Sequence, residues 1–169
     1  MARLNRFSDH DDRHRRRMNE CGRVQYVEQV LGPALRPFIN RFLVVEYSSL
    51  RRDAHLPDIS PVAAFSFRGG CRIDGNQWAP RAAFTGLRET LRTHEHCDGN
   101  AVLLATFTPT GASAFLRPPL EEFVGTTTDL SGILGRSGEL KRLHEQLAGA
   151  QEHRQRIKLR RGGMALAGN

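Results

Sequence analysis

The sequence predicts a mainly β domain that ends in a small helical layer. Two observations support this fold class. Short segments rich in β-branched and aromatic residues occur between residues 41 and 107, whereas the clearest helical spacing follows after residue 110. A chain of 169 residues is also long enough to bury a core of its own. We therefore expect a β body that carries helices at its C-terminal end.

The strand candidates lie between turn signals. In chain order they are 41–47, 62–67, a pair within 71–80 that turns at Asp74–Asn76, segments within 82–96, and 100–107. Alternation along the second candidate places Phe65 and Phe67 on one face. The last candidate, NAVLLATF, is a continuous apolar run, as is typical of a strand buried on both faces.

The later segments carry helical signals. A short helix is expected at 111–116, and Asp129 is expected to cap a helical turn over 130–134. A longer helix is expected at about 138–157, because apolar side chains recur there at spacings of three and four. The apolar stripe consists of Leu140, Leu143, Leu147, Ala150 and Ile157. Such a stripe has to pack on the β body or on a second subunit, and we expect it to form a homodimer interface.

The positive charge of the chain is confined to its two ends. The formal net charge is +7, of which +3 falls in residues 1–23 and +5 in residues 154–161. Residues 24–153 carry a balance of −1. We therefore divide the chain into a charged flexible arm (1–23), a folded domain (24–157) and a basic tail or linker stub (158–169). Phosphate binding by the folded domain is not expected.

Several functional classes lack their sequence signals. Three cysteines form no CxxC pair, which favours a reducing compartment. No apolar run is long enough to span a bilayer and no signal peptide is recognisable, so a cytoplasmic location is expected. Phosphate loops, a dinucleotide fingerprint and a nucleophile elbow are absent from the sequence. Whether the protein starts at Met1 or Met18 stays open.

Five motifs in a fixed order resemble one known family. They are LRPFINRFLVVE, LPDISPVAAFSFRGG, FTGLRETLRTH, LLATFTPTGASAFLRPPLEEF, and DLSGILG with the helix LKRLHEQLAGAQEHRQRI. Together, over about residues 33–157, they resemble the N-terminal sensor domain of AraC-type transcriptional regulators. The resemblance implies a cupin-like β-barrel or sandwich followed by helices that pair subunits. In full-length members a domain with two helix-turn-helix motifs follows.

The resemblance implies a regulatory domain that binds a small effector, dimerises and is not an enzyme. No cofactor is expected, and the effector is unidentified. Residues 158–169 are too short for a helix-turn-helix domain, so sequence-specific DNA binding by this chain alone is not expected. A natural short protein, a truncated gene product and a designed fragment all remain open. The candidates for ligand binding are Phe65, Phe67, Arg68, Trp78, Phe84, Arg88, His94 and Phe107.

Two alternatives remain. On a strand, His94 and His96 point the same way, and neutral imidazoles are common metal ligands. A metal-dependent cupin-like enzyme is therefore possible in principle. The next histidine along the chain is His144, on the late helix, so a third ligand is missing and no metal is expected. The second alternative is a standalone interaction module that forms mixed dimers with full-length regulators.

Overall fold

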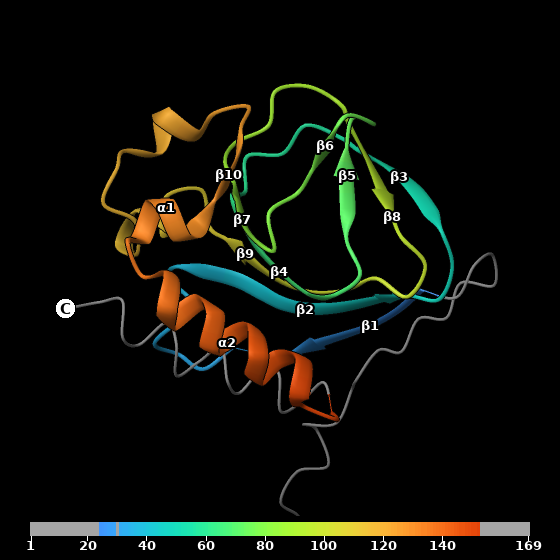
Figure 1. The fold of residues 1–169 in the computed structure, drawn as a ribbon. Helices are drawn as coiled ribbons and strands as arrows, with labels where there is room; N and C mark the ends of the chain where they lie inside the picture. Colours follow the sequence, from blue (N-terminus) through green and yellow to red (C-terminus); the bar gives the residue numbers. More distant parts are fainter. Residues whose placement is uncertain (1–23, 30, 153–169) are drawn as a thin grey trace, which may run out of the picture.

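The fold consists of two antiparallel sheets that face each other (Figure 1). Residues of both sheets line a cavity between them. The computed structural model describes residues 24–29 and 31–152. Among them, the larger sheet has the strand order β1 (Val24–Gln29), β2 (Ile39–Tyr47), β9 (Ala101–Phe107), β4 (Val62–Arg68), β7 (Ala82–Thr85) and β10 (Thr127–Asp129). The smaller sheet has the order β3 (Arg51–His55), β8 (Arg92–His96), β5 (Cys71–Ile73) and β6 (Gln77–Trp78). The predicted mainly β fold with C-terminal helices is confirmed.

The helical segments follow β9, as the sequence indicates. They are the 3₁₀ turns η1 (Gly111–Ala114) and η2 (Leu120–Phe123) and the helices α1 (Leu130–Leu134) and α2 (Ser137–Gly149). The Asp129 carboxylate accepts a hydrogen bond from the backbone N–H of Ser131, which confirms the predicted cap. Gly135 ends α1 in a left-handed conformation, with φ of 64°. The predicted boundaries of these short elements are therefore close to the observed ones.

The larger sheet buries its two faces differently. On β4, Phe65 and Phe67 point away from the cavity into the main hydrophobic core, whereas Ala64 and Ser66 line the cavity. The same alternation on β9 sends Leu103 to the core and Leu104 to the cavity. The large apolar side chains thus form a core between the sheet and the helices, and smaller ones leave room between the two sheets.

Helix α2 lies along the outer side of the larger sheet (Figure 1) and contacts β4. Leu140, Leu143 and Leu147 are buried there in the main core. The apolar stripe therefore packs on the body of its own chain. The helix ends at Gly149, and Ala150 is extended, with ψ of 129°, so the prediction of a helix to residue 157 is wrong. Glycine ends the helix here because it is a poor helix former. Ile157 lies outside the described residues.

Three strands, β1, β3 and β10, have no counterpart among the predicted elements. β3 reads RRDAH and has a low apolar content, so neither alternation nor β-branched residues mark it. It becomes a strand because it pairs with β8 along its whole length. Its position matters for the site described below.

Within the described residues, no helix is long and apolar enough to cross a membrane.

Candidate metal and ligand site

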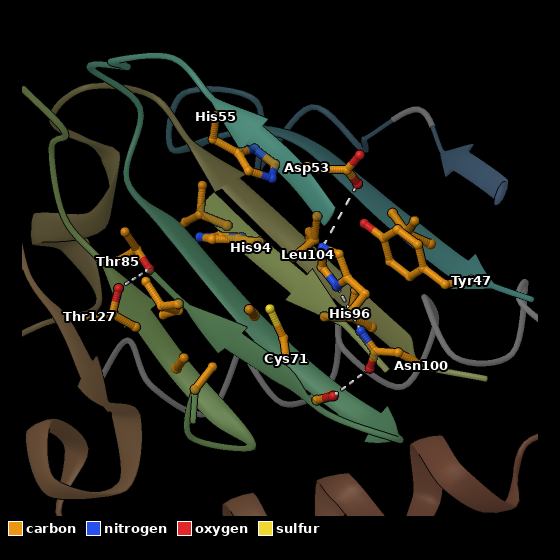
Figure 2. A pocket seen from close by; sticks show the side chains of 18 of the residues that line it. Tyr47, Asp53, His55, Cys71, Thr85, His94, His96, Asn100, Leu104 and Thr127 are labelled. Atoms are coloured by element: carbon orange, nitrogen blue, oxygen red, sulfur yellow. Dashed lines mark hydrogen bonds and ion pairs between the residues drawn. The ribbon is translucent and has the colours of Figure 1, made fainter. Parts of the chain in front are cut away.

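The two sheets enclose a cavity of about 810 Å³. Part of its lining is drawn in Figure 2. Val62 and Ala64 on β4, and Leu104 and Thr106 on β9, form part of its wall. These side chains are small or medium-sized, and this leaves a volume of the size that small organic ligands occupy in proteins. The cavity is therefore the first candidate for a binding site.

Three histidines meet at the wall formed by the smaller sheet (Figure 2). His94 and His96 share one face of β8, and His55 ends the neighbouring strand β3. Each offers one ring nitrogen, and these atoms lie within 4.8 Å of one another. The ring centroids of His55 and His94 are 4.4 Å apart, and those of His94 and His96 are 6.1 Å apart. We refer to His55, His94 and His96 as the histidine cluster.

The histidine cluster is neutral at physiological pH. Burial, together with the neighbouring His55 and His96, lowers the pKa of His94 to about 4. Burial also lowers the pKa of His96 to about 4, against the opposing effect of the Asp53 carboxylate. The pKa of His55 is lowered by burial and by the charge of Arg88. Neutral imidazole is the form that binds metal ions.

The cluster has the donor atoms that a transition metal requires. Among the described residues, neither His55 Nε2 nor His96 Nε2 has a hydrogen-bond partner, although both are buried. A buried polar atom without a partner is costly, and such an atom needs an explanation such as a bound ion or water. Three imidazoles are a common ligand set for a catalytic zinc ion. The residues present therefore fit a metal ion.

Asn100 holds His96 from behind. Asn100 Nδ2 lies 2.9 Å from His96 Nδ1, and Ser66 Oγ donates a hydrogen bond to Asn100 Oδ1 at 3.2 Å (Figure 2). If the amide oxygen faces the ring, Nδ1 donates the hydrogen bond and Nε2 keeps a free lone pair. Ser66 then accepts from the amide nitrogen, so both contacts are retained. Metal binding thus requires this amide orientation, which also fixes the ring.

Removing the Asn100 amide is expected to weaken metal binding without removing a ligand. We expect Asn100→Leu to lower the metal affinity by about 10–100-fold, as for other partners behind a metal ligand. Asn100→Asp should retain most of the affinity, because a carboxylate also accepts from Nδ1. Titration of the metal-free variants with Zn²⁺ measures this difference. Equal affinities of Asn100→Leu and the unaltered protein would remove Asn100 from the site.

The low histidine pKa values predict a loss of stability in mild acid. Unfolded histidine titrates near 6.5, whereas His94 and His96 titrate near 4 in the folded protein. Between these values the unfolded chain binds more protons, so stability falls as the pH drops from about 6.5 to 4. For His96 alone, the free energy of unfolding falls by about 3 kcal/mol once this histidine is protonated in both the folded and the unfolded state. Urea denaturation of the metal-free protein at pH 7 and pH 4.5 measures this loss of stability. The His96→Gln variant should lose less stability between these two pH values.

The wall around the cluster is uncharged on two further sides. The Tyr47 ring stacks on His96 with 3.9 Å between centroids, and burial raises the pKa of Tyr47 well above its usual value. Burial likewise raises the pKa of Cys71 to about 12, so this thiol stays protonated. Both groups limit access of water to His96 without adding a negative charge.

The structure separates the predicted ligand candidates into two groups. Trp78, Arg88 and His94 line the cavity. Trp78 lies half-exposed, with Arg72 stacked 4.6 Å from its ring centroid. Five candidates are not among the lining residues: Phe65, Phe67, Phe84 and Phe107 belong to the main core, and Arg68 donates to the Gly99 carbonyl. The phenylalanines lie outside because the helices need a large apolar face to pack against.

The histidine cluster corrects the prediction that this chain is not an enzyme. That prediction followed from the family resemblance, and the metal-dependent alternative was disfavoured because His94 and His96 lacked a third ligand. His55 supplies the third ligand from the adjacent strand. Three neutral imidazoles are the ligands of many metalloenzyme centres. The histidine cluster therefore contradicts the prediction of a non-catalytic domain. His144, the next histidine along the chain, is not part of the cluster.

No protein-family model matches the sequence, and no curated protein matches it. Among solved structures, KdgF from Halomonas sp. is similar, with 12% sequence identity and a TM-score of 0.42. The matched region covers 59% of this chain and 91% of KdgF.

Proposed function

We propose that this protein binds a small organic ligand at a divalent transition metal held by His55, His94 and His96. The observation that carries the proposal is the convergence of these three imidazoles in a cavity of about 810 Å³. Imidazole ligands suit zinc, copper, iron and nickel ions, whereas calcium and magnesium prefer oxygen.

Three protein ligands leave coordination positions for a ligand. When bound there, the metal would polarise an oxygen atom of the ligand as a Lewis acid. The residues of the chain have separate roles. His55, His94 and His96 would hold the ion, Asn100 orients His96, and Tyr47 shields its ring. Strands β4 and β9 form part of the opposite wall of the cavity.

The metal content of the protein tests the proposal. Protein purified without chelator is expected to contain close to one transition metal ion per chain by elemental analysis. Stripping the metal with a chelator should lower the melting temperature, and adding Zn²⁺ should restore it, because a ligand at a hundred times its Kd adds about 2.7 kcal/mol of stability. The proposal would be contradicted by protein that contains no metal and gains no stability from zinc, copper, iron or nickel ions.

A second candidate function is effector sensing in an AraC-type regulator, and the contacts between the resembling motifs favour it. Asp58 of the LPDIS motif and Arg88 of the FTGLR motif form a β-bridge. Gly111 of the TPTGA motif abuts the Phe38 carbonyl, where a Cβ atom would come within 1.9 Å. The motifs thus form one structural unit, as expected if they are inherited together. In this role the metal-bound ligand would be an effector, and the chain would pair with a second subunit.

Turnover and pairing separate the two candidates. Consumption of a bound ligand by the metal-loaded protein would assign catalysis, whereas binding without turnover supports sensing. For sensing we further expect the chain to co-purify with a full-length regulator of the same type after co-expression. A monomer at high micromolar concentration that captures no such regulator would contradict pairing. Residues 153–169, which include the basic run, lie outside the described part.

A further inference from the structure

We propose that the ligand of this cavity is a small carboxylic acid whose carboxylate is bound by Arg88, with a second oxygen, as in a hydroxy or keto acid, directed at the histidine cluster. The inference deepens the proposed function and rests on a ligand being bound in this cavity. It does not require the metal for the Arg88 contact itself.

Arg88 is a buried cation with an unused donor. Its side chain is 11% exposed and lines the cavity. The backbone is fixed, because Arg88 and Asp58 exchange both of their N–H···O hydrogen bonds at 2.9 and 3.0 Å. Within the described residues, Arg88 Nε has no hydrogen-bond partner. A buried guanidinium N–H without a partner is suited to donate a hydrogen bond to an oxygen atom of a ligand.

The ion pair of Arg88 leaves this donor available. Arg88 Nη2 lies 3.4 Å from Asp58 Oδ2, which is a long contact to a partly exposed carboxylate. By contrast, Arg51 Nε lies 2.6 Å from Asp53 Oδ1 and is already engaged. Arg81 is exposed and contacts His144 Nε2 at 3.1 Å. Arg88 is therefore the buried arginine of this lining that keeps a free guanidinium donor among the described residues.

The charge of the lining favours an anion. The described lining residues include four arginines and two aspartates, which is an excess of two positive charges. Asp58 beside Arg88 repels a phosphate dianion more strongly than a singly charged carboxylate, so the charges around Arg88 itself favour a carboxylate. The planar guanidinium also matches the geometry of a carboxylate.

Arg88 and the histidine cluster act on the same part of the cavity. Arg88, His55 and His94 all line this one cavity. Arg88 pairs with Asp58, three residues beyond His55 along the chain. A ligand held by Arg88 therefore lies beside the imidazoles, where a second oxygen can reach a metal position.

The test compares an acid with its neutral counterpart. Glycolate and pyruvate, glycolamide as the uncharged match, and inorganic phosphate are titrated by calorimetry into Zn²⁺-loaded and metal-free protein. We expect at least one acid to bind and glycolamide to bind at least about tenfold more weakly. Arg88→Gln should lower the affinity for that acid by at least about tenfold, and Arg88→Lys should retain part of it. Arg81→Gln, an exposed arginine of the same cavity, serves as the matched control.

A second variant guards against misfolding of Arg88→Gln. Asp58→Asn releases Arg88 from its ion pair and is expected to strengthen acid binding severalfold. Equal binding of glycolate and glycolamide, tighter binding of phosphate than of either acid, or weaker acid binding in Asp58→Asn would overturn the inference. Arg88-dependent acid binding without any metal binding would refute the metal site alone. Zn²⁺ binding without acid binding would refute the carboxylate inference alone.

Discussion

Single replacement of His55, His94 or His96 by Gln is expected to abolish tight metal binding. Each change removes one of three ligands, so the loss should exceed the roughly 10–100-fold effect of altering a residue behind a ligand. The three variants should lose similar amounts, because the ligand nitrogens form one cluster within 4.8 Å. Titration of metal-free protein with Zn²⁺, with a competing chelator of known affinity, measures the dissociation constants.

His144→Gln is the matched control for these variants. His144 lies on α2, outside the cavity lining, and its ring contacts Arg81. Its replacement should leave the metal affinity unchanged. The stability of the metal-free variants checks that a loss of metal binding does not come from unfolding. The His96→Gln variant should stay folded, because it removes a buried imidazole whose Nε2 has no hydrogen-bond partner among the described residues. A loss of metal binding in the His144 variant, with the other three unaffected, would place the metal elsewhere.

Leu147→Ala is expected to destabilise the protein by about 2–5 kcal/mol. Leu147 is fully buried between α2 and the outer face of the larger sheet, in the same core as Leu103 and Phe65. Truncation leaves a cavity that the tightly paired sheet cannot collapse to fill. Urea denaturation of a dilute sample, monitored by circular dichroism, measures the change.

Gln146→Ala provides the control on the same helix. Gln146 is exposed, so its truncation should change stability by less than about 0.5 kcal/mol. The comparison also distinguishes two uses of the apolar stripe. If Leu147 stabilises only a dimer, the effect of its truncation should disappear in dilute monomeric protein. An effect of the predicted size that is independent of protein concentration supports packing on the chain's own sheet.

The sequence predicted the outline of the fold well because local patterns decide it. The strand 62–67 alternates, the strand 100–107 is continuously apolar, and Asp129 sits where a helix start needs an acceptor. All three elements are present. By contrast, Gly149 ends α2 earlier than the heptad spacing indicates, because spacing records the apolar face and not the backbone preference of each residue.

The site was harder to predict, because it depends on pairing between strands far apart in the sequence. His55 and His94 are brought together only by the register of β3 against β8. The sequence RRDAH gives no apolar pattern from which that register follows. The sequence also does not indicate which face of the larger sheet points into the cavity. Phe65 marks one face of β4, but only the position of α2 shows that this face lies outside the cavity.

The most direct test of the metal centre is an anomalous difference map from crystals of the protein grown with Zn²⁺, recorded at the zinc absorption edge. We expect one peak inside the cavity, at about 2.0–2.1 Å from a ring nitrogen of each of His55, His94 and His96. The Asn100 amide oxygen should face His96 Nδ1 in the same crystals. A map without a peak at these rings, or with the zinc bound only by other side chains, would contradict a metal centre in this cavity.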